Sequence, residues 1–162
     1  MARALGIALP ISLKHSIEIC DFIRGKKLQT AKKILEDVIA KKRAIPFKRF
    51  TEGSGHKKGI SSGKYPVKAS REILKLLNSV EANAKDKNLD VDDLVIIHIV
   101  AKKGYSRMRY GRRPWREAKS THIEVYVKEE RNKKQEKEIK KEIKKQKEIK
   151  TSKGKKEEKK ND

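Results

Sequence analysis

The sequence predicts a mixed α+β fold. Three segments before residue 88 carry apolar side chains at helical spacing, and two later segments carry strand patterns. Charge is the third observation, because the 162 residues include 44 Lys and Arg against 22 Asp and Glu, a formal net charge of +22. Hydrophobic residues make up 35% of the chain, so we expect a small folded domain with basic appendages rather than one domain spanning every residue.

The first two predicted elements are separated by Pro10. Residues 3–9 predict a short edge strand. Ser12 is a suitable N-cap for a helix, and Gly25 is a natural end for it. The apolar positions of this helix are Leu13, Ile17, Cys20 and Ile23. Cys20 on that stripe is interpreted as a small core residue rather than a reactive thiol.

The second predicted helix has the clearest amphipathic pattern. Thr30 is its candidate cap, and Pro46 prevents much continuation beyond the basic run at 41–43. Its apolar stripe consists of Ala31, Ile34, Leu35, Val38 and Ile39. Residues 47–65 follow as a long basic loop rich in Gly and Ser, and a loop of this length in a small domain is usually functional or disordered.

A third helix is expected to begin near Pro66 and to end near Lys87. Its apolar stripe consists of Val67, Ile73, Leu74, Leu77, Val80 and Ala84. An acidic group at 90–93 follows. A magnesium site is one interpretation of that group, but turn chemistry before a strand is favoured, because Asp readily bonds its own backbone in turns.

Two strand patterns, 94–102 and 121–127, close the predicted domain, and they are most simply paired as an antiparallel hairpin. If pairing continues beyond the sheet, the residues between them form an arm that projects ~25 Å. We therefore predict a domain over 1–127, with basic loop 47–65 and hairpin arm 94–127. A Lys/Glu-rich C-terminal extension follows over 128–162, as a frayed helix or a disordered tail.

The excess positive charge is confined to particular segments. Residues 41–68 have a net charge of +8, and residues 102–119 have a net charge of +7. The remainder of 1–127 is neutral, while 128–162 has a net charge of +7. The domain is thus a neutral body with two basic projections, which predicts a polyanionic partner. Nucleic acid is the leading candidate and an anionic membrane surface the second.

Aromatic residues follow the same division. Of the eight in the chain, six lie in the two basic segments: Phe47, Phe50, Tyr65, Tyr105, Tyr110 and Trp115. Local packing that orders the loops explains any single ring equally well. The combined pattern favours RNA binding, because rings stack on unpaired bases while cations hold phosphates.

Other features exclude several function classes. The single cysteine precludes an intramolecular disulfide and a Cys-based zinc site, and no apolar run is long enough to span a bilayer. The N-terminus makes a poor signal peptide, so we expect a reduced, cytoplasmic protein. Neither a Gly-rich phosphate loop nor a catalytic triad is evident, and the four histidines are scattered. We expect no enzyme activity, no cofactor and no metal.

Several stretches carry a resemblance to a known family. They are EDVIAKKRAIPFKRF (36–50), GKYPVKASREILKLLNSVEANA (63–84), NLDVDDLVIIHI (88–99) and THIEVYV (121–127). Together they resemble the universal large-subunit ribosomal protein called L twenty-two in bacteria and L seventeen in eukaryotes. The resemblance covers residues 3–128.

The resemblance implies three helices packed on a small antiparallel sheet, with a long protruding β-hairpin. It implies binding to large-subunit ribosomal RNA, a role in subunit assembly, and a hairpin tip that lines the nascent-peptide exit tunnel. The implied partners are that RNA, neighbouring ribosomal proteins and the nascent polypeptide, with neither a membrane nor a homo-oligomer. A free basic nucleic-acid-binding or chromatin-associated protein is the alternative.

The candidate site residues come from the two basic segments. The predicted RNA-binding residues are Lys41, Lys42, Arg43, Lys48, Arg49, Lys57, Lys58, Lys64, Tyr65, Lys102, Lys103, Arg107, Arg109, Arg112, Arg113, Trp115 and Arg116. By resemblance, the tunnel-lining tip consists of Arg109, Tyr110, Gly111, Arg112 and Arg113.

Overall fold

The computed structural model describes residues 1–112 and 114–130. Arg113 lies outside the described residues, and so does the predicted C-terminal extension from residue 131 onward. The boundary predicted between domain and extension therefore stays a prediction.

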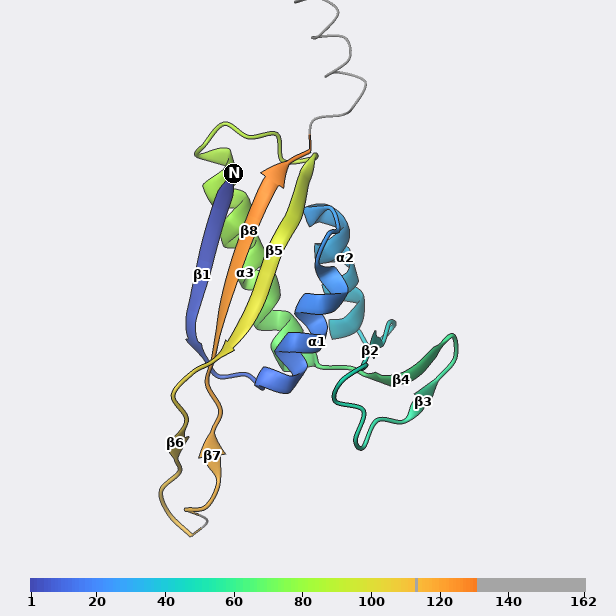
Figure 1. Ribbon diagram of the computed structural model, residues 1–162, viewed down its shortest axis with the longest axis vertical. Coiled ribbons are helices and arrows are strands. Elements are labelled where there is room, and N and C mark those ends of the chain that lie inside the picture. The colour runs from blue at the N-terminus through green and yellow to red at the C-terminus, as the bar shows by residue number, and fades with distance from the viewer. Residues whose placement is uncertain (113, 131–162) are drawn as a thin grey trace, which may run out of the picture. The chain divides into compact units, whose positions relative to one another are not determined.

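A three-stranded antiparallel sheet forms the centre of the described fold (Figure 1). Its strands lie in the order β1 (Ala2–Leu9), β8 (Thr121–Glu129) and β5 (Leu94–Lys103). The predicted edge strand and the predicted pairing of the two later strands are both confirmed. The last strand, β8, pairs with both β1 and β5. The arm therefore begins where the pair β5–β8 leaves the main sheet.

The apolar alternation of the sheet determines which face is buried. In β8, Ile123, Val125 and Val127 are fully buried, as their spacing predicts. In β5 the alternation is interrupted by a register shift between Ile96 and His98. The shift lets both Ile96 and Ile99 reach the core, a departure that the run of Val and Ile did not reveal.

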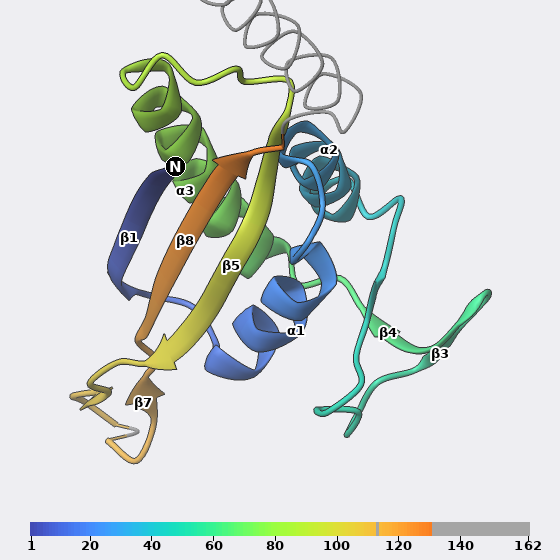
Figure 2. The same ribbon diagram turned by 45° about the horizontal axis from the view of Figure 1, so that its top comes forward.

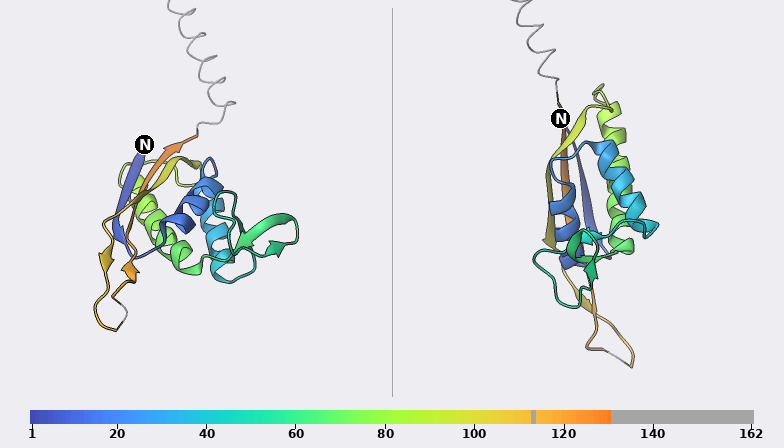
Figure 3. Two further views of the ribbon diagram at one scale, coloured as in Figure 1. Left: turned by 60° about the horizontal axis from the view of Figure 1, so that its bottom comes forward. Right: turned by 90° about the vertical axis from the view of Figure 1, so that its right-hand side faces the viewer.

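Within the described residues, three helices cover one face of this sheet (Figure 3, right). They are α1 (Leu13–Ile23), α2 (Leu28–Ile39) and α3 (Val67–Lys85). α1 contacts β5, α3 contacts β1, and α2 packs mainly against α3. The predicted α+β architecture is therefore confirmed, and burial of these apolar faces provides most of its stability.

Two helices differ in detail from their predicted patterns. In α1 the buried side chains include Ile19, whereas Leu13 and Ile17 are half-buried. α2 begins at Leu28 rather than after Thr30. The earlier start follows from tertiary contacts, because the connection between α1 and α2 bonds to the edge of β5. Gly25 (φ +75°) donates its N–H to the Ile96 carbonyl at 2.8 Å.

The third helix confirms its predicted start. Pro66 is the N-cap, and Val67 is the first helical residue. The helix ends at Lys85, before the predicted Lys87, and the chain turns through Asn88 with φ +52°. Bend and turn backbone covers residues 91–93 of the acidic group, in agreement with the favoured interpretation of that group.

The segment predicted as a basic loop contains regular structure. A second small sheet, in the order β2-β4-β3, is formed by β2 (Ile45–Pro46), β4 (Ile60–Lys64) and β3 (His56–Lys57). The sequence predicted a basic loop over 47–65, functional or disordered, and within this range the structure places the paired strands β3 and β4. β2 and β3 are only two residues long and β4 (ISSGK) is rich in Gly and Ser, so none of them shows the apolar alternation that signals a strand.

The predicted arm continues beyond the main sheet as β6 (Arg107–Met108) paired with β7 (Glu117–Ala118). At its base, Gly104 donates its N–H to the Ser120 carbonyl at 3.1 Å. A Cβ at Gly104 would lie 3.1 Å from the backbone carbon of Ser120, so glycine permits the close approach of the two chains. This pairing aims the arm away from the body.

Cys20 lies in the core, as its position on the helical stripe predicts. Its side chain is 1% exposed, and burial raises the pKa of the thiol to about 12. The thiol therefore stays protonated and unreactive at neutral pH. None of the helices in the described part of the chain is long and apolar enough to cross a membrane.

Candidate nucleic-acid interface

The basic segments lie toward one end of the body, where the arm and the small sheet project in different directions (Figures 1 and 2). The small sheet and the arm both project from the end of the main sheet at which α1 begins (Figures 1 and 2). The basic turn at 41–43 follows α2 and leads directly into β2. Basic residues of the segments 41–68 and 102–119 are thus far apart in the sequence but lie toward the same end of the body. We call this part of the surface the basic end.

The predicted RNA-binding side chains are accessible wherever the structure describes them. Lys57 and Lys64 are half-buried, and the others that are described are exposed. Lys102 differs from the rest, because its Nζ lies 2.7 Å from Glu124 Oε1 and its charge is compensated on the main sheet. The RNA-binding role of these residues stays a prediction, and Arg113 lies outside the described residues.

Glu18 in α1 positions the turn at 48–50, which lies between β2 and β3 of the small sheet. Its side chain is 3% exposed, and its carboxylate accepts the N–H groups of three consecutive residues. The distances are 3.1 Å from Lys48 N, 2.8 Å from Arg49 N and 3.0 Å from Phe50 N. Hydrogen bonds to a buried charge are among the strongest in proteins, so Glu18 fixes a basic turn.

Sequence reasoning missed Glu18, because its hydrogen-bond partners are distant in the sequence. The carboxylate and its partners are about thirty residues apart, with separations of 30, 31 and 32 positions. An acid on the buried side of an amphipathic helix was the one available hint, since buried carboxylates need partners.

Cation–π contacts hold several basic side chains near the body. The Arg43 guanidinium lies 5.5 Å from the Phe22 ring centroid, and Lys57 Nζ lies 5.5 Å from that of Tyr65. Lys64 Nζ lies 5.4 Å from the Phe47 ring centroid and also donates to the Glu52 carbonyl at 2.9 Å. These contacts restrict side chains without neutralising their charge.

The structure divides the six aromatic residues of the basic segments into two groups. Phe47 is 3% exposed and belongs to the core, and Phe50 is half-buried against it. Local packing therefore explains these two rings, against the interpretation that groups all six with RNA stacking. The exposed rings, available to stack on bases, are Tyr65, Tyr105, Tyr110 and Trp115.

The described residues of the tip are exposed. These are Arg109, Tyr110, Gly111 and Arg112. Arg109 donates its backbone N–H to the Arg116 carbonyl at 2.8 Å, which closes the tip loop. Tyr110 reaches full exposure, so the tip presents cations and an aromatic ring to any neighbour.

Acidic residues gather at the opposite end of the body. The turn that follows α3 carries Asp90, Asp92 and Asp93, and it lies at the end of the main sheet remote from the arm (Figure 1). Asp93 pairs with Lys27 at 2.9 Å. Among the described residues, no three His, Cys, Asp or Glu side chains come together as a metal site. The acidic turn therefore lies remote from the basic end.

The family model and the relatives found by comparison with known proteins all indicate one family. A sequence model of the family described as ribosomal protein L22p/L17e matches residues 4–128. A relative from Archaeoglobus fulgidus, named large ribosomal subunit protein uL22, is 51% identical over 112 residues, covering 67% of this chain and 72% of the relative. Proteins of the same name from Methanosphaera stadtmanae and Staphylothermus marinus are each 44% identical, covering 80% of this chain and 89% of each relative.

Proposed function

Because the chain belongs to the L22p/L17e family of ribosomal proteins, we propose that it is a structural constituent of the large ribosomal subunit that binds large-subunit rRNA through its basic end. Family membership also implies the non-enzymatic role and the cytoplasmic localisation that the sequence predicts. The observation that supports RNA binding most strongly is the placement of exposed cations from three segments toward one end of the body.

The mechanism we propose is electrostatic anchoring combined with base stacking. Lys and Arg side chains of the small sheet and arm neutralise phosphates and release counterions. The exposed rings of Tyr65 and Trp115 stack on unpaired bases. Specificity then comes from the shape of the folded RNA and from single-stranded bases, because these residues lie on projections and not on a helix suited to a major groove.

The arm has a second role in this proposal. Its paired strands carry an exposed tip away from the body, and the tip combines cations with the fully exposed Tyr110. We propose that rRNA and neighbouring ribosomal proteins surround the arm, and that its tip lines the path of the nascent polypeptide. The same contacts between rRNA and the two projections would order the RNA during subunit assembly.

Sedimentation of cell lysates in high-salt sucrose gradients tests whether the protein is a stable constituent of the subunit. We expect the protein to co-sediment with large subunits and to be absent from DNA-bound fractions. Recovery mainly in a free or DNA-bound pool would contradict the proposed function and favour a free nucleic-acid-binding protein.

A further inference from the structure

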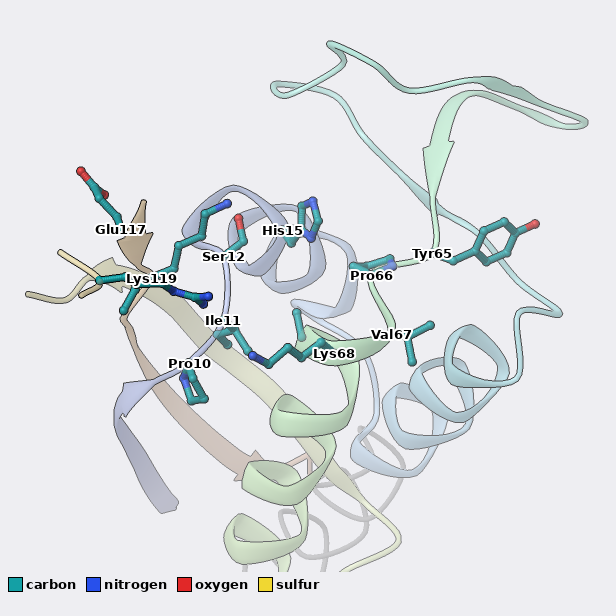
Figure 4. A pocket seen from close by; sticks show the side chains of 13 residues that line it. Pro10, Ile11, Ser12, His15, Tyr65, Pro66, Val67, Lys68, Glu117 and Lys119 are labelled. Carbon is teal, nitrogen blue, oxygen red and sulfur yellow. The ribbon is translucent and has the colours of Figure 1, made fainter. Parts of the chain in front are cut away.

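A cavity of about 540 Å³ lies between the start of α1, the start of α3 and the arm (Figure 4). Its apolar wall includes Ile11 and Ala69, which are each 2% exposed. Its polar wall includes Ser12, which has no side-chain cap hydrogen bond, and His15. None of these four residues belongs to the predicted RNA-binding set.

Three cations from separate elements line this cavity: Lys68 from α3, and Arg109 and Lys119 from the two sides of the arm. Within the described residues, their side chains form no ion pair and no hydrogen bond. Glu117 also lines the cavity, but its side chain points away from it (Figure 4). The convergence of like charges without a protein anion favours an anionic ligand from outside.

His15 lines the cavity and is affected both by burial and by the cations around it. Burial lowers the pKa of its imidazole, and the nearby charges of Lys64 and Lys119 lower it further. The ring is therefore biased toward its neutral form, in which one nitrogen still donates a hydrogen bond.

A second cavity, of about 400 Å³, continues this surface toward the small sheet. It shares Ser12, His15 and Lys119 with the first cavity and adds Arg49 and Lys64. Glu52 is its acidic lining residue. The two cavities together form a concave basic path from the arm to the small sheet, passing the start of α1.

We propose that the larger cavity binds the phosphodiester backbone of a single RNA strand that crosses from the small sheet to the arm. Lys68 and Lys119 contact its phosphates, while the apolar wall accommodates a ribose. The proposal rests on the proposed function and extends RNA contact from the two projections to the body. RNA is favoured over an acidic protein segment because the path joins two surfaces that already present cations and stacking rings.

The first turns of α1 and α3 reinforce this preference. Both helices begin at this cavity, and neither has an acidic residue in its first turn. The positive ends of their helix dipoles add partial positive charge at the same place, although Val67 at the start of α3 already donates its N–H to the Tyr65 carbonyl at 2.9 Å. The side-chain cations remain the principal determinants, because they supply full charges.

The test compares full-length variants in binding to a large-subunit rRNA transcript over a range of salt concentrations. Lys68→Gln combined with Lys119→Gln should lower the slope of log K against log salt concentration by ~1.4–1.8, since two phosphate contacts are lost. Affinity at about 0.1 M salt should fall roughly 20–60-fold. Lys68→Arg with Lys119→Arg should retain binding, because the charges are kept.

The matched control is Lys33→Gln with Lys75→Gln, which removes two charges from exposed helix positions outside the basic end. A cavity variant that behaves like this control, while the wild type binds rRNA, would overturn the cavity site and leave the proposed function standing. The cavity site would also be overturned if the cavity variant bound rRNA normally but lost its association with ribosomal proteins, because that result assigns the cavity to a protein ligand. Absence of rRNA binding by the wild type would overturn both.

Discussion

Replacement of Arg107, Arg109, Arg112 and Arg113 by Gln is expected to weaken rRNA binding strongly and to reduce its salt dependence by four phosphate contacts. Four phosphate contacts correspond to a slope change of ~2.8–3.6 in log K against log salt concentration. Affinity at about 0.1 M salt should fall roughly 10³-fold. The cause is local, because the described members of this group are exposed and no ion pair among the described residues compensates their charge.

The control for this experiment removes the same charge from elsewhere in the domain. Gln replaces Lys26, Lys33, Lys75 and Lys87, all of them outside the predicted RNA-binding set. This variant should keep nearly the wild-type slope, since its charges do not touch RNA. Equal losses in the two variants would mean that net charge alone attracts the RNA and that the arm is no anchor.

Replacement of Glu18 by Ala is expected to produce a large loss of stability. Three N–H donors of the segment 48–50 lose their acceptor, and the helix loses a buried, fully bonded carboxylate. We expect the free energy of unfolding to fall by about 2–4 kcal/mol, measured by chemical denaturation. Glu18→Gln should lose less, because its amide oxygen still accepts a hydrogen bond.

Glu36→Ala serves as the control, because Glu36 is exposed on α2. Its effect should stay within about 0.5 kcal/mol. Glu18→Gln should also weaken rRNA binding while the domain remains folded, because one of the two accepting oxygens is lost and the basic turn at 48–50 is held by fewer hydrogen bonds. A stability for Glu18→Ala equal to that of the control would show that the carboxylate does not organise this segment.

The sequence predicted the main sheet and helices because their signals are local. Ile123, Val125 and Val127 alternate along one strand, and the stripe of α3 recurs at helical spacing. Helix faces and boundaries were less accurate where tertiary contacts decide them. The bonds between the α1–α2 connection and the edge of β5 are an example, since they start α2 earlier than its cap pattern indicates.

Features that depend on distant residues were not predictable. The small sheet follows from backbone pairing in a polar segment, and its attachment follows from Glu18 about thirty positions earlier. Phe47 lies in a basic segment by sequence but in the core by structure. Lys68 and Lys119 line the same cavity, but this could not be predicted from the sequence, because α3 and the arm come together only in the folded chain.

Mapping of protein–RNA crosslinks in intact large subunits tests the central claim most directly. The exposed rings of Tyr65 and Trp115 give photoreactive positions on the small sheet and the arm without any substitution. We predict that crosslinked peptides come chiefly from these two projections and that they join to large-subunit rRNA. Crosslinks concentrated at the acidic turn 90–93, or joined to other nucleic acids, would contradict the proposal that the basic end anchors this protein.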